Sequence, residues 1–172
     1  MKMIAVLRLG HRISRDKRVT THVALVSRAL GVDKMFVDKK DSKLEETVHA
    51  VCERFGGDFS IETGVNWRHV IRDWRGVKVH LTMYGEPFED AVEEIREKDG
   101  DLLVVVGAEK VPSEVYQLSD YNVAVGNQPH SEIAALALFL DRYTMGKWQC
   151  KRFKGKIEVV PSKRGKKVVT RE

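Results

Sequence analysis

Three apolar stretches of this chain end at a glycine, where a change of chain direction is expected. The glycines are Gly85, Gly107 and Gly126, which follow the stretches VHLTMY, LLVVV and VAV. A glycine permits a tight turn and lets the backbone approach a ligand closely. In open parallel sheets, ligands bind beyond the carboxyl ends of the strands. We therefore expect these three strand ends to line one pocket, in which backbone groups hold the ligand.

The stretch after Gly126 turns the chain from a strand into a helix. Apolar residues at positions 133, 136, 137 and 140 have the spacing of one helix face. The first N–H groups of a helix are unpaired and favour acceptor-rich ligand groups, and Pro129 is expected in the first helical turn. Asn127 and Ser131 are candidates both for capping this helix and for contacting a ligand. A single turn of this kind is an ordinary connection, so the binding site is inferred from the three stretches together.

The common nucleotide-binding and metal-binding signatures are absent from the sequence. Neither G-x-x-x-x-G-K-[ST] nor G-x-G-x-x-G occurs, so the expected ligand is nucleotide-like but held by backbone amides and apolar walls rather than by its phosphates. Cys52 and Cys150 are far apart in the sequence, and His49 lies one helical turn from Cys52 without other ligands nearby. We therefore expect neither a disulfide framework nor a metal site.

Strand-like and helix-like stretches alternate along the chain, which favours an α/β fold with a mostly parallel sheet. We expect Thr20 or Thr21 to cap the first helix, and Ser42 with Glu45 to form a capping box for the second. A chain of 172 residues is expected to form one domain. Residues 1–146 are its main part, and residues 147–172 extend it with a basic β-hairpin. The expected strands are residues 3–8, 34–37, 59–62, 79–85, 102–106, 123–125, 156–160 and 166–171, and the expected helices are residues 20–30, 42–55, 66–74, 86–98, 113–118 and a helix that follows Gln128.

The net charge of +5 is distributed unevenly along the chain. Residues 1–31 carry a net charge of +6 and residues 147–172 a net charge of +8, whereas residues 32–146 carry −9. Because clustered cations attract polyphosphates, the two basic ends favour a localised nucleic-acid face. For Arg12 and Lys17 we expect ion pairs with the acidic body instead.

The sequence contains no run of about 18 apolar residues, so no transmembrane helix is expected. The apolar stretch at the N-terminus is too short for a signal peptide and is expected to form the first strand. Together with the cysteine usage, these features predict a cytoplasmic protein.

Four long motifs make the sequence similar to a known family. They are RLGHRISRDKRVTTHVALVSRALG at 8–31, LTMYG at 81–85, VVVGAEKVP at 104–112 and GNQPHSEIAALALFLDR at 126–142. Over nearly its whole length the chain resembles the archaeal tRNA ribose 2′-O-methyltransferases that modify cytidine 56 in the T-loop, which belong to the SPOUT class of S-adenosylmethionine-dependent methyltransferases. The resemblance implies a deep trefoil knot that holds the cofactor, a homodimer in which the basic loop of the partner completes each site, and a C-terminal hairpin in place of a terminal helix.

The resemblance also implies a reaction, in which a ribose 2′-hydroxyl attacks the methyl group of S-adenosylmethionine. Positioning of the two groups is then the main task of the enzyme. SPOUT ribose methyltransferases are often assigned an arginine of the first motif, which corresponds here to Arg15 or Arg18. Because arginine keeps its proton, we expect it to orient a phosphate or ribose rather than to act as a base. His22 and His130 are the candidates for the base.

The residues expected to hold S-adenosylmethionine come from the strand ends, chiefly through backbone groups, and no metal is expected there. For Glu109, a contact with the cofactor and a role in capping or ion pairing are equally open. Three other interpretations of the sequence remain: a non-catalytic RNA-binding α/β module, a SPOUT methyltransferase acting on another RNA position, or an α/β enzyme using a different nucleotide. The catalytic candidates are Arg15, Arg18 and His22, and the cofactor-binding candidates are Leu81, Gly107, Ala108, Glu109, Lys110, Val111, Val125, Gly126, Asn127, Gln128, Pro129, His130, Ser131 and Glu132.

Overall fold

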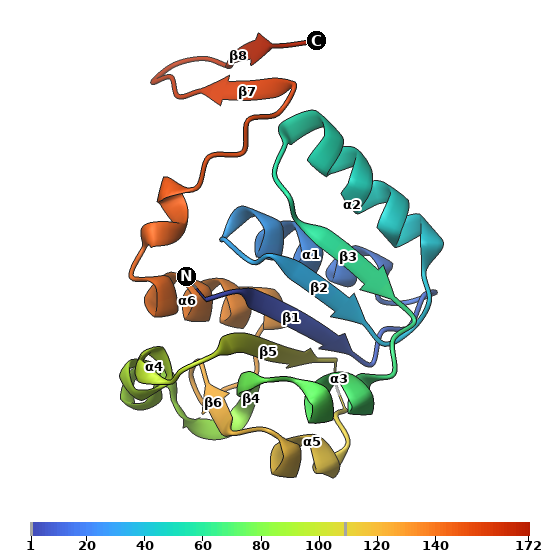
Figure 1. Ribbon diagram of the computed structural model, residues 1–172, viewed down its shortest axis with the longest axis vertical. Coiled ribbons are helices and arrows are strands. Elements are labelled where there is room, and N and C mark those ends of the chain that lie inside the picture. The colour runs from blue at the N-terminus through green and yellow to red at the C-terminus, as the bar shows by residue number, and fades with distance from the viewer. Residues whose placement is uncertain (1, 109) are drawn as a thin grey trace.

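The chain forms a six-stranded sheet covered by helices on both faces, followed by a separate two-stranded hairpin (Figure 1). The computed structural model describes residues 2–108 and 110–172. In the large sheet the strand order is β3-β2-β1-β5-β4-β6, and each neighbouring pair is parallel. The elements are β1 (Ile4–Leu9), α1 (Lys17–Ala29), β2 (Lys34–Val37), α2 (Ser42–Phe55), β3 (Ser60–Thr63), α3 (Trp67–Asp73), β4 (Gly76–Pro87), α4 (Phe88–Glu97), β5 (Asp101–Gly107), α5 (Ser113–Leu118), β6 (Tyr121–Ala124), α6 (Glu132–Thr144), the 3-10 helix η1 (Lys147–Cys150), β7 (Ile157–Val160) and β8 (Lys167–Thr170).

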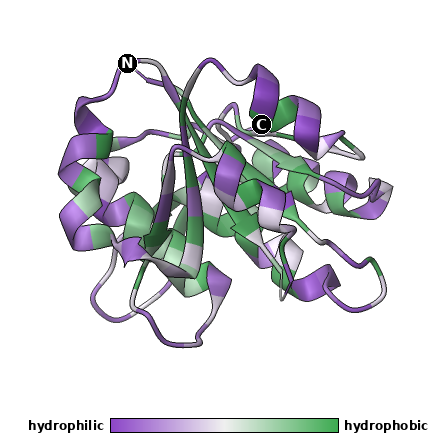
Figure 2. Cartoon of the chain, turned by 90° about the horizontal axis from the view of Figure 1, so that it is seen from below, coloured by the Kyte–Doolittle hydropathy of each residue, from purple (hydrophilic) through white to green (hydrophobic). Residues whose placement is uncertain are grey.

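The core lies on both faces of the central strands β1 and β5. All six residues of β1 are buried, and so are the residues of β5 from Leu102 to Val106. Runs of Val, Leu and Ile without polar alternation are typical of parallel strands buried on both faces. One face packs against α1, α2, α4 and α6, and the smaller cluster on the other face includes apolar residues of α3 and α5. Figure 2 shows the hydrophobic strands enclosed by helices whose outer surfaces are hydrophilic.

The predicted α/β fold with a parallel sheet is confirmed, whereas two predicted helix caps are wrong. Helix α1 begins at Lys17 after Asp16, three residues earlier than expected, and Thr20 is buried inside it. Helix α2 is capped by Asp41, whose carboxylate accepts a hydrogen bond from the Leu44 N–H at 3.1 Å. The predicted capping box fails because Glu45 instead accepts hydrogen bonds from Thr63 on the neighbouring strand β3.

The C-terminal segment leaves α6 through a left-handed residue, Met145, and crosses to the far end of α2. There Lys154 forms a backbone bridge with Gly56, and the predicted hairpin β7–β8 follows. The basic loop after β1 instead contacts the beginning of α2, through His11 and Asp41. The two basic segments also meet, because Arg28 of α1 donates to the Gly56 carbonyl oxygen at 2.6 Å and its guanidinium lies 4.5 Å from the centre of the Phe153 ring. The localised nucleic-acid face stays a prediction.

Candidate active site

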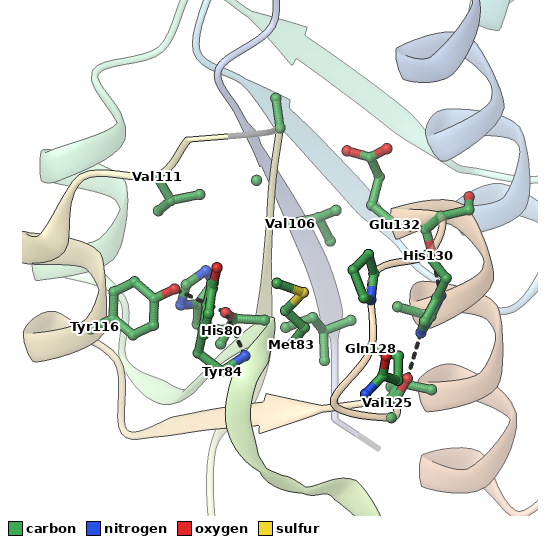
Figure 3. A pocket seen from close by; sticks show the side chains of 18 residues that line it. His80, Met83, Tyr84, Val106, Val111, Tyr116, Val125, Gln128, His130 and Glu132 are labelled. Atoms are coloured by element: carbon green, nitrogen blue, oxygen red, sulfur yellow. Dashed lines mark hydrogen bonds between the residues drawn. The ribbon is translucent and has the colours of Figure 1, made fainter.

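A pocket of about 330 Å³ lies where β4, β5 and β6 end, as the three glycine-terminated stretches predicted (Figure 3). Because these strands are neighbours in the order β5-β4-β6, their carboxyl ends meet at one edge of the sheet. Figure 3 shows Tyr116 and His80 on one side of the pocket, and His130 and Glu132 on the other. The lining residues are His80, Leu81, Thr82, Met83, Tyr84, Val106, Gly107, Ala108, Val111, Tyr116, Val125, Gly126, Gln128, Pro129, His130, Ser131, Glu132 and Ala135.

Most of the cofactor-binding candidates line this pocket. Lys110 and Asn127 do not line it, and Glu109 lies outside the described residues. The candidates that line it are Leu81, Gly107, Ala108, Val111, Val125, Gly126, Gln128, Pro129, His130, Ser131 and Glu132. The remaining lining residues, which come from β4, β5, α5 and α6, are not among the candidates predicted from the sequence. For His80 and Thr82, the signal that could have found them is their position on the same strand end as Leu81.

The wall formed by β4 contains an interruption in the sheet. Leu81 pairs with Val123 of β6, and the pairing resumes only at Glu86, so residues 82–85 leave the ladder and line or flank the pocket. The Asn127 side chain donates hydrogen bonds to the carbonyl oxygens of Met83 at 2.7 Å and of Gly85 at 3.0 Å. Asn127 therefore does not cap α6 but fixes the interruption against the turn after β6.

Two glycines shape the pocket for different reasons. A Cβ atom at Gly107 would lie 2.1 Å from Cγ2 of Val111, so the two pocket walls touch only because residue 107 has no side chain. Gly126 has open space around it, since the nearest atom to an added Cβ, His130 Nε2, is 4.0 Å away. Its φ of +78° is what requires glycine, because other residues rarely adopt this conformation.

The side of the pocket near α5 is built from hydrogen-bonded aromatic and polar side chains. His80 Nδ1 lies 3.0 Å from Asn122 Oδ1, and the Asn122 amide nitrogen donates to the Tyr116 carbonyl oxygen at 3.0 Å. The rings of His80 and Tyr116 meet edge to face at 4.8 Å, and the Thr82 and Tyr116 hydroxyls are 2.9 Å apart. Burial lowers the pKa of His80 below its usual value, so this imidazole is neutral near pH 7.

The side of the pocket near α6 has its polar groups already paired. Ser131 Oγ caps α6 by accepting from the N–H groups of Ile133 and Ala134. The two ring nitrogens of His130 lie 2.5 Å from the Val125 carbonyl oxygen and 3.1 Å from that of Ser131, so the ring is held against the turn before α6. The expectation that the first N–H groups of α6 remain unused is wrong for Ile133 and Ala134, because Ser131 Oγ accepts from both. Pro129 does not lie in the first helical turn as expected, because the helix begins at Glu132.

The catalytic candidates Arg15, Arg18 and His22 lie outside the pocket of their own chain. All three side chains are exposed, on the loop after β1 and on the first turns of α1. The loop nevertheless adjoins the pocket wall, because the Ala108 N–H donates to the Leu9 carbonyl oxygen at 3.0 Å and an added Cβ at Gly10 would lie 3.2 Å from the Ala108 Cβ. Arg12 forms an ion pair with Asp16, 3.0 Å away on the same loop.

The described residues contain no group of three or more metal-ligating side chains. No helix among them is long and apolar enough to cross a membrane.

The fold is that of the SPOUT methyltransferases. The Aquifex aeolicus TrmH/SpoU tRNA-modifying enzyme matches with a TM-score of 0.56 at 13% identity, over 86% of this chain and 76% of that chain. The SpoU methyltransferase AviRb from Streptomyces viridochromogenes, solved with its cofactor AdoMet, matches with a TM-score of 0.54 at 14% identity, over 84% of this chain and 57% of that chain. The trefoil knot implied by the sequence resemblance is consistent with this fold.

Sequence relatives define the family. The family model described as tRNA ribose 2′-O-methyltransferase, aTrm56, matches residues 55–169, and the chain belongs to this family. The tRNA (cytidine(56)-2′-O)-methyltransferase of Pyrococcus horikoshii is 59% identical, over 97% of this chain and 85% of that protein. The protein of the same name from Thermococcus kodakarensis is 56% identical, over 99% of both. A third, from Thermoplasma volcanium, is 57% identical over 96% of this chain, which spans about half of that longer relative.

Proposed function

We propose that this protein transfers a methyl group from S-adenosylmethionine to the ribose 2′-hydroxyl of cytidine 56 in tRNA. The observation that carries the proposal is the pocket at the ends of β4, β5 and β6, in a chain that belongs to the tRNA ribose 2′-O-methyltransferase family. Relatives more than 50% identical over almost the whole chain carry the name of this activity.

The residues of the pocket fit this cofactor. Apolar walls from Leu81, Val106 and Val125 suit a flat purine, and Thr82 and Glu132 offer polar groups to hydroxyls and an ammonium. The volume of about 330 Å³ is that of a small-molecule site. When bound, S-adenosylmethionine supplies a methyl group on a positively charged sulfur, which is electrophilic without further activation.

The protein then has to hold the two reactants in line and to receive the proton of the 2′-hydroxyl. We assign the Arg15 and Arg18 guanidinium groups to the phosphate and ribose of the substrate, since they keep their protons at any physiological pH. Among Arg15, Arg18 and His22, we therefore assign His22 to receive the proton of the ribose 2′-hydroxyl.

These three residues are exposed and do not line the pocket of their own chain, which supports a homodimer in which the loop of one protomer meets the pocket of its partner. Residues 147–172 extend the same domain in this proposal and add a second basic surface.

The activity is tested with an unmodified tRNA transcript and labelled S-adenosylmethionine, followed by mass mapping of the product. One methyl group on the ribose of cytidine 56 is expected. The matched control is the same tRNA with 2′-deoxycytidine at position 56, which lacks the attacking hydroxyl and should accept no label. Equal labelling of both tRNAs would contradict the proposed site of transfer, and RNA binding without cofactor binding would show a non-catalytic module.

A further inference from the structure

A line of buried polar side chains leads from the pocket into the interior of the molecule. It starts at Arg8 on β1, which is 1% exposed although it carries a charge. Its Nη1 donates to Glu132 Oε2 at 2.8 Å, and its Nε donates to Thr20 Oγ1 at 3.4 Å. The Glu132 side chain is 31% exposed and lines the pocket. Arg8 therefore joins the pocket to α1.

The line continues from Thr20 to the beginning of α2. Thr20 Oγ1 lies 2.7 Å from His11 Nδ1, and His11 Nε2 lies 2.9 Å from Asp41 Oδ2. One assignment of protons satisfies every contact: His11 Nε2–H donates to Asp41, the Thr20 hydroxyl donates to His11 Nδ1, and Thr20 Oγ1 accepts from Arg8. All these groups are buried.

The Asp41, His11 and Thr20 contacts have the connectivity of a hydrolase triad. The hydroxyl that would be the nucleophile is 0% exposed, and Thr20 does not line the pocket. No substrate reaches it, so nucleophilic catalysis is excluded. The arrangement instead supports Arg8 from behind.

Arg8 in turn holds Glu132. A buried guanidinium is costly unless it is paired and hydrogen-bonded, which keeps the carboxylate of Glu132 against it. One carboxylate oxygen, Oε2, is taken by Arg8, and the partly exposed carboxylate remains at the pocket rim (Figure 3). A separate residue, Asp38, fixes the base of the basic loop by accepting hydrogen bonds from the backbone N–H groups of Gly10 and His11.

We propose that Arg8, Thr20 and His11 are positioning residues that act through Glu132. In this arrangement Glu132 binds the ammonium group of the methionine part of S-adenosylmethionine, and the buried line keeps the carboxylate at the position that this contact needs. This inference rests on the proposed function, because it takes the pocket to be the cofactor site.

The test replaces the link farthest from solvent. Thr20→Val keeps the shape of the side chain but removes the hydroxyl, so Arg8 loses one of its two partners. We expect the Kd of S-adenosylmethionine, measured by calorimetry, and its KM to rise roughly fivefold to tenfold, the size of one lost hydrogen bond. The kcat and the KM for tRNA should stay within about twofold. Thr20→Ser restores the hydroxyl and should restore the Kd.

The matched control is Ser27→Ala, which removes another buried hydroxyl of α1 that has no hydrogen-bond partner among the described residues. It should leave the Kd unchanged. A purely structural role of Thr20 would lower the melting temperature in Thr20→Val and leave the Kd of the folded protein at the wild-type value, and this result would overturn the inference.

A double variant tests whether Thr20 acts through Glu132. Glu132→Gln should weaken cofactor binding by itself, and adding Thr20→Val should then cause less than a further twofold loss. Independent, multiplying effects would show that Thr20 acts by another route and would also overturn the inference. Failure of the proposed function is distinguishable, because wild-type protein would then not bind S-adenosylmethionine at all.

Discussion

At the scale of single residues, the pocket depends on two glycines whose roles can be separated by substitution. Gly107→Ala would place its Cβ against Cγ2 of Val111. We expect calorimetry to show at least a tenfold loss of cofactor affinity. Val111→Ala removes the clashing Cγ2 methyl group and leaves the Val111 Cβ position 3.5 Å from the new Cβ, an ordinary contact. The double variant should therefore bind better than Gly107→Ala alone, and the absence of any rescue would show that residue 107 matters for another reason.

Gly126→Val should also abolish cofactor binding, for reasons of conformation rather than space. The residue has φ of +78°, which valine disfavours strongly. The matched control is Gly146→Val, since Gly146 has φ of +74° but lies at the end of α6, outside the pocket. Urea unfolding should show that both variants lose about 1–3 kcal/mol of stability, whereas calorimetry should show lost binding only in Gly126→Val.

The buried His80 gives stability a pH dependence. Its pKa is lowered from 6.5 by burial, so the unfolded chain binds more protons than the folded one as the pH falls below about 6.5. The contribution of neutral His80 to the free energy of unfolding is therefore complete above that pH and is lost on acidification. The free energy of unfolding should fall by at most about 1.4 kcal/mol per pH unit from this group. Urea unfolding between pH 7.5 and 5.5 should show a shallower slope for His80→Gln than for the wild type, and equal slopes would contradict this assignment.

At the scale of elements, the pocket wall formed by residues 82–85 is held by one side chain. Asn127 donates to two carbonyl oxygens of this segment. In Asn127→Asp an acceptor would face both oxygens, so repulsion should release the segment. We expect cofactor binding to weaken more in Asn127→Asp than in Asn127→Ala, with faster hydrogen exchange in residues 82–87. If Asn127→Asp bound as well as Asn127→Ala, the two contacts would have no role in binding.

Much of the fold followed from local patterns in the sequence. The bounds of β2 and α5 were predicted to the residue, because each is a short stretch between clear breaks in the sequence pattern. The pocket was placed from three glycine-terminated stretches because parallel strands present their ends together. The caps of α1 and α2 were missed because Thr20 and Glu45 have partners on other elements, His11 and Thr63, which spacing along the chain does not show. Tyr116 was missed for the same reason, since only the tertiary fold brings α5 to the strand ends.

At the scale of the whole molecule, the proposed dimer makes a complementation test possible. Gly126→Val should lack a working cofactor pocket, and an Arg15→Ala/Arg18→Ala chain should lack the substrate-binding loop. If each site combines the pocket of one protomer with the loop of its partner, the mixed dimer has one intact site. Dissociated and reassociated equal mixtures should regain about a quarter of wild-type methylation, because half of the dimers are mixed and each has one working site of two.

The control mixes each variant with itself, which should stay inactive. Mixtures without recovered activity, despite mixed dimers shown by mass spectrometry, would mean that loop and pocket of the same chain work together.

The pocket walls come together through main-chain atoms, at Gly107, Gly126 and the interrupted pairing of β4 with β6. A library containing every single amino-acid change should therefore give an uneven tolerance map. Exchanges among similar aliphatic residues at Leu81, Val106 and Val125 should survive selection often, while almost no replacement should survive at the two glycines. During the evolution of such proteins, the side chains that line the pocket should therefore change much faster than the backbone path around it.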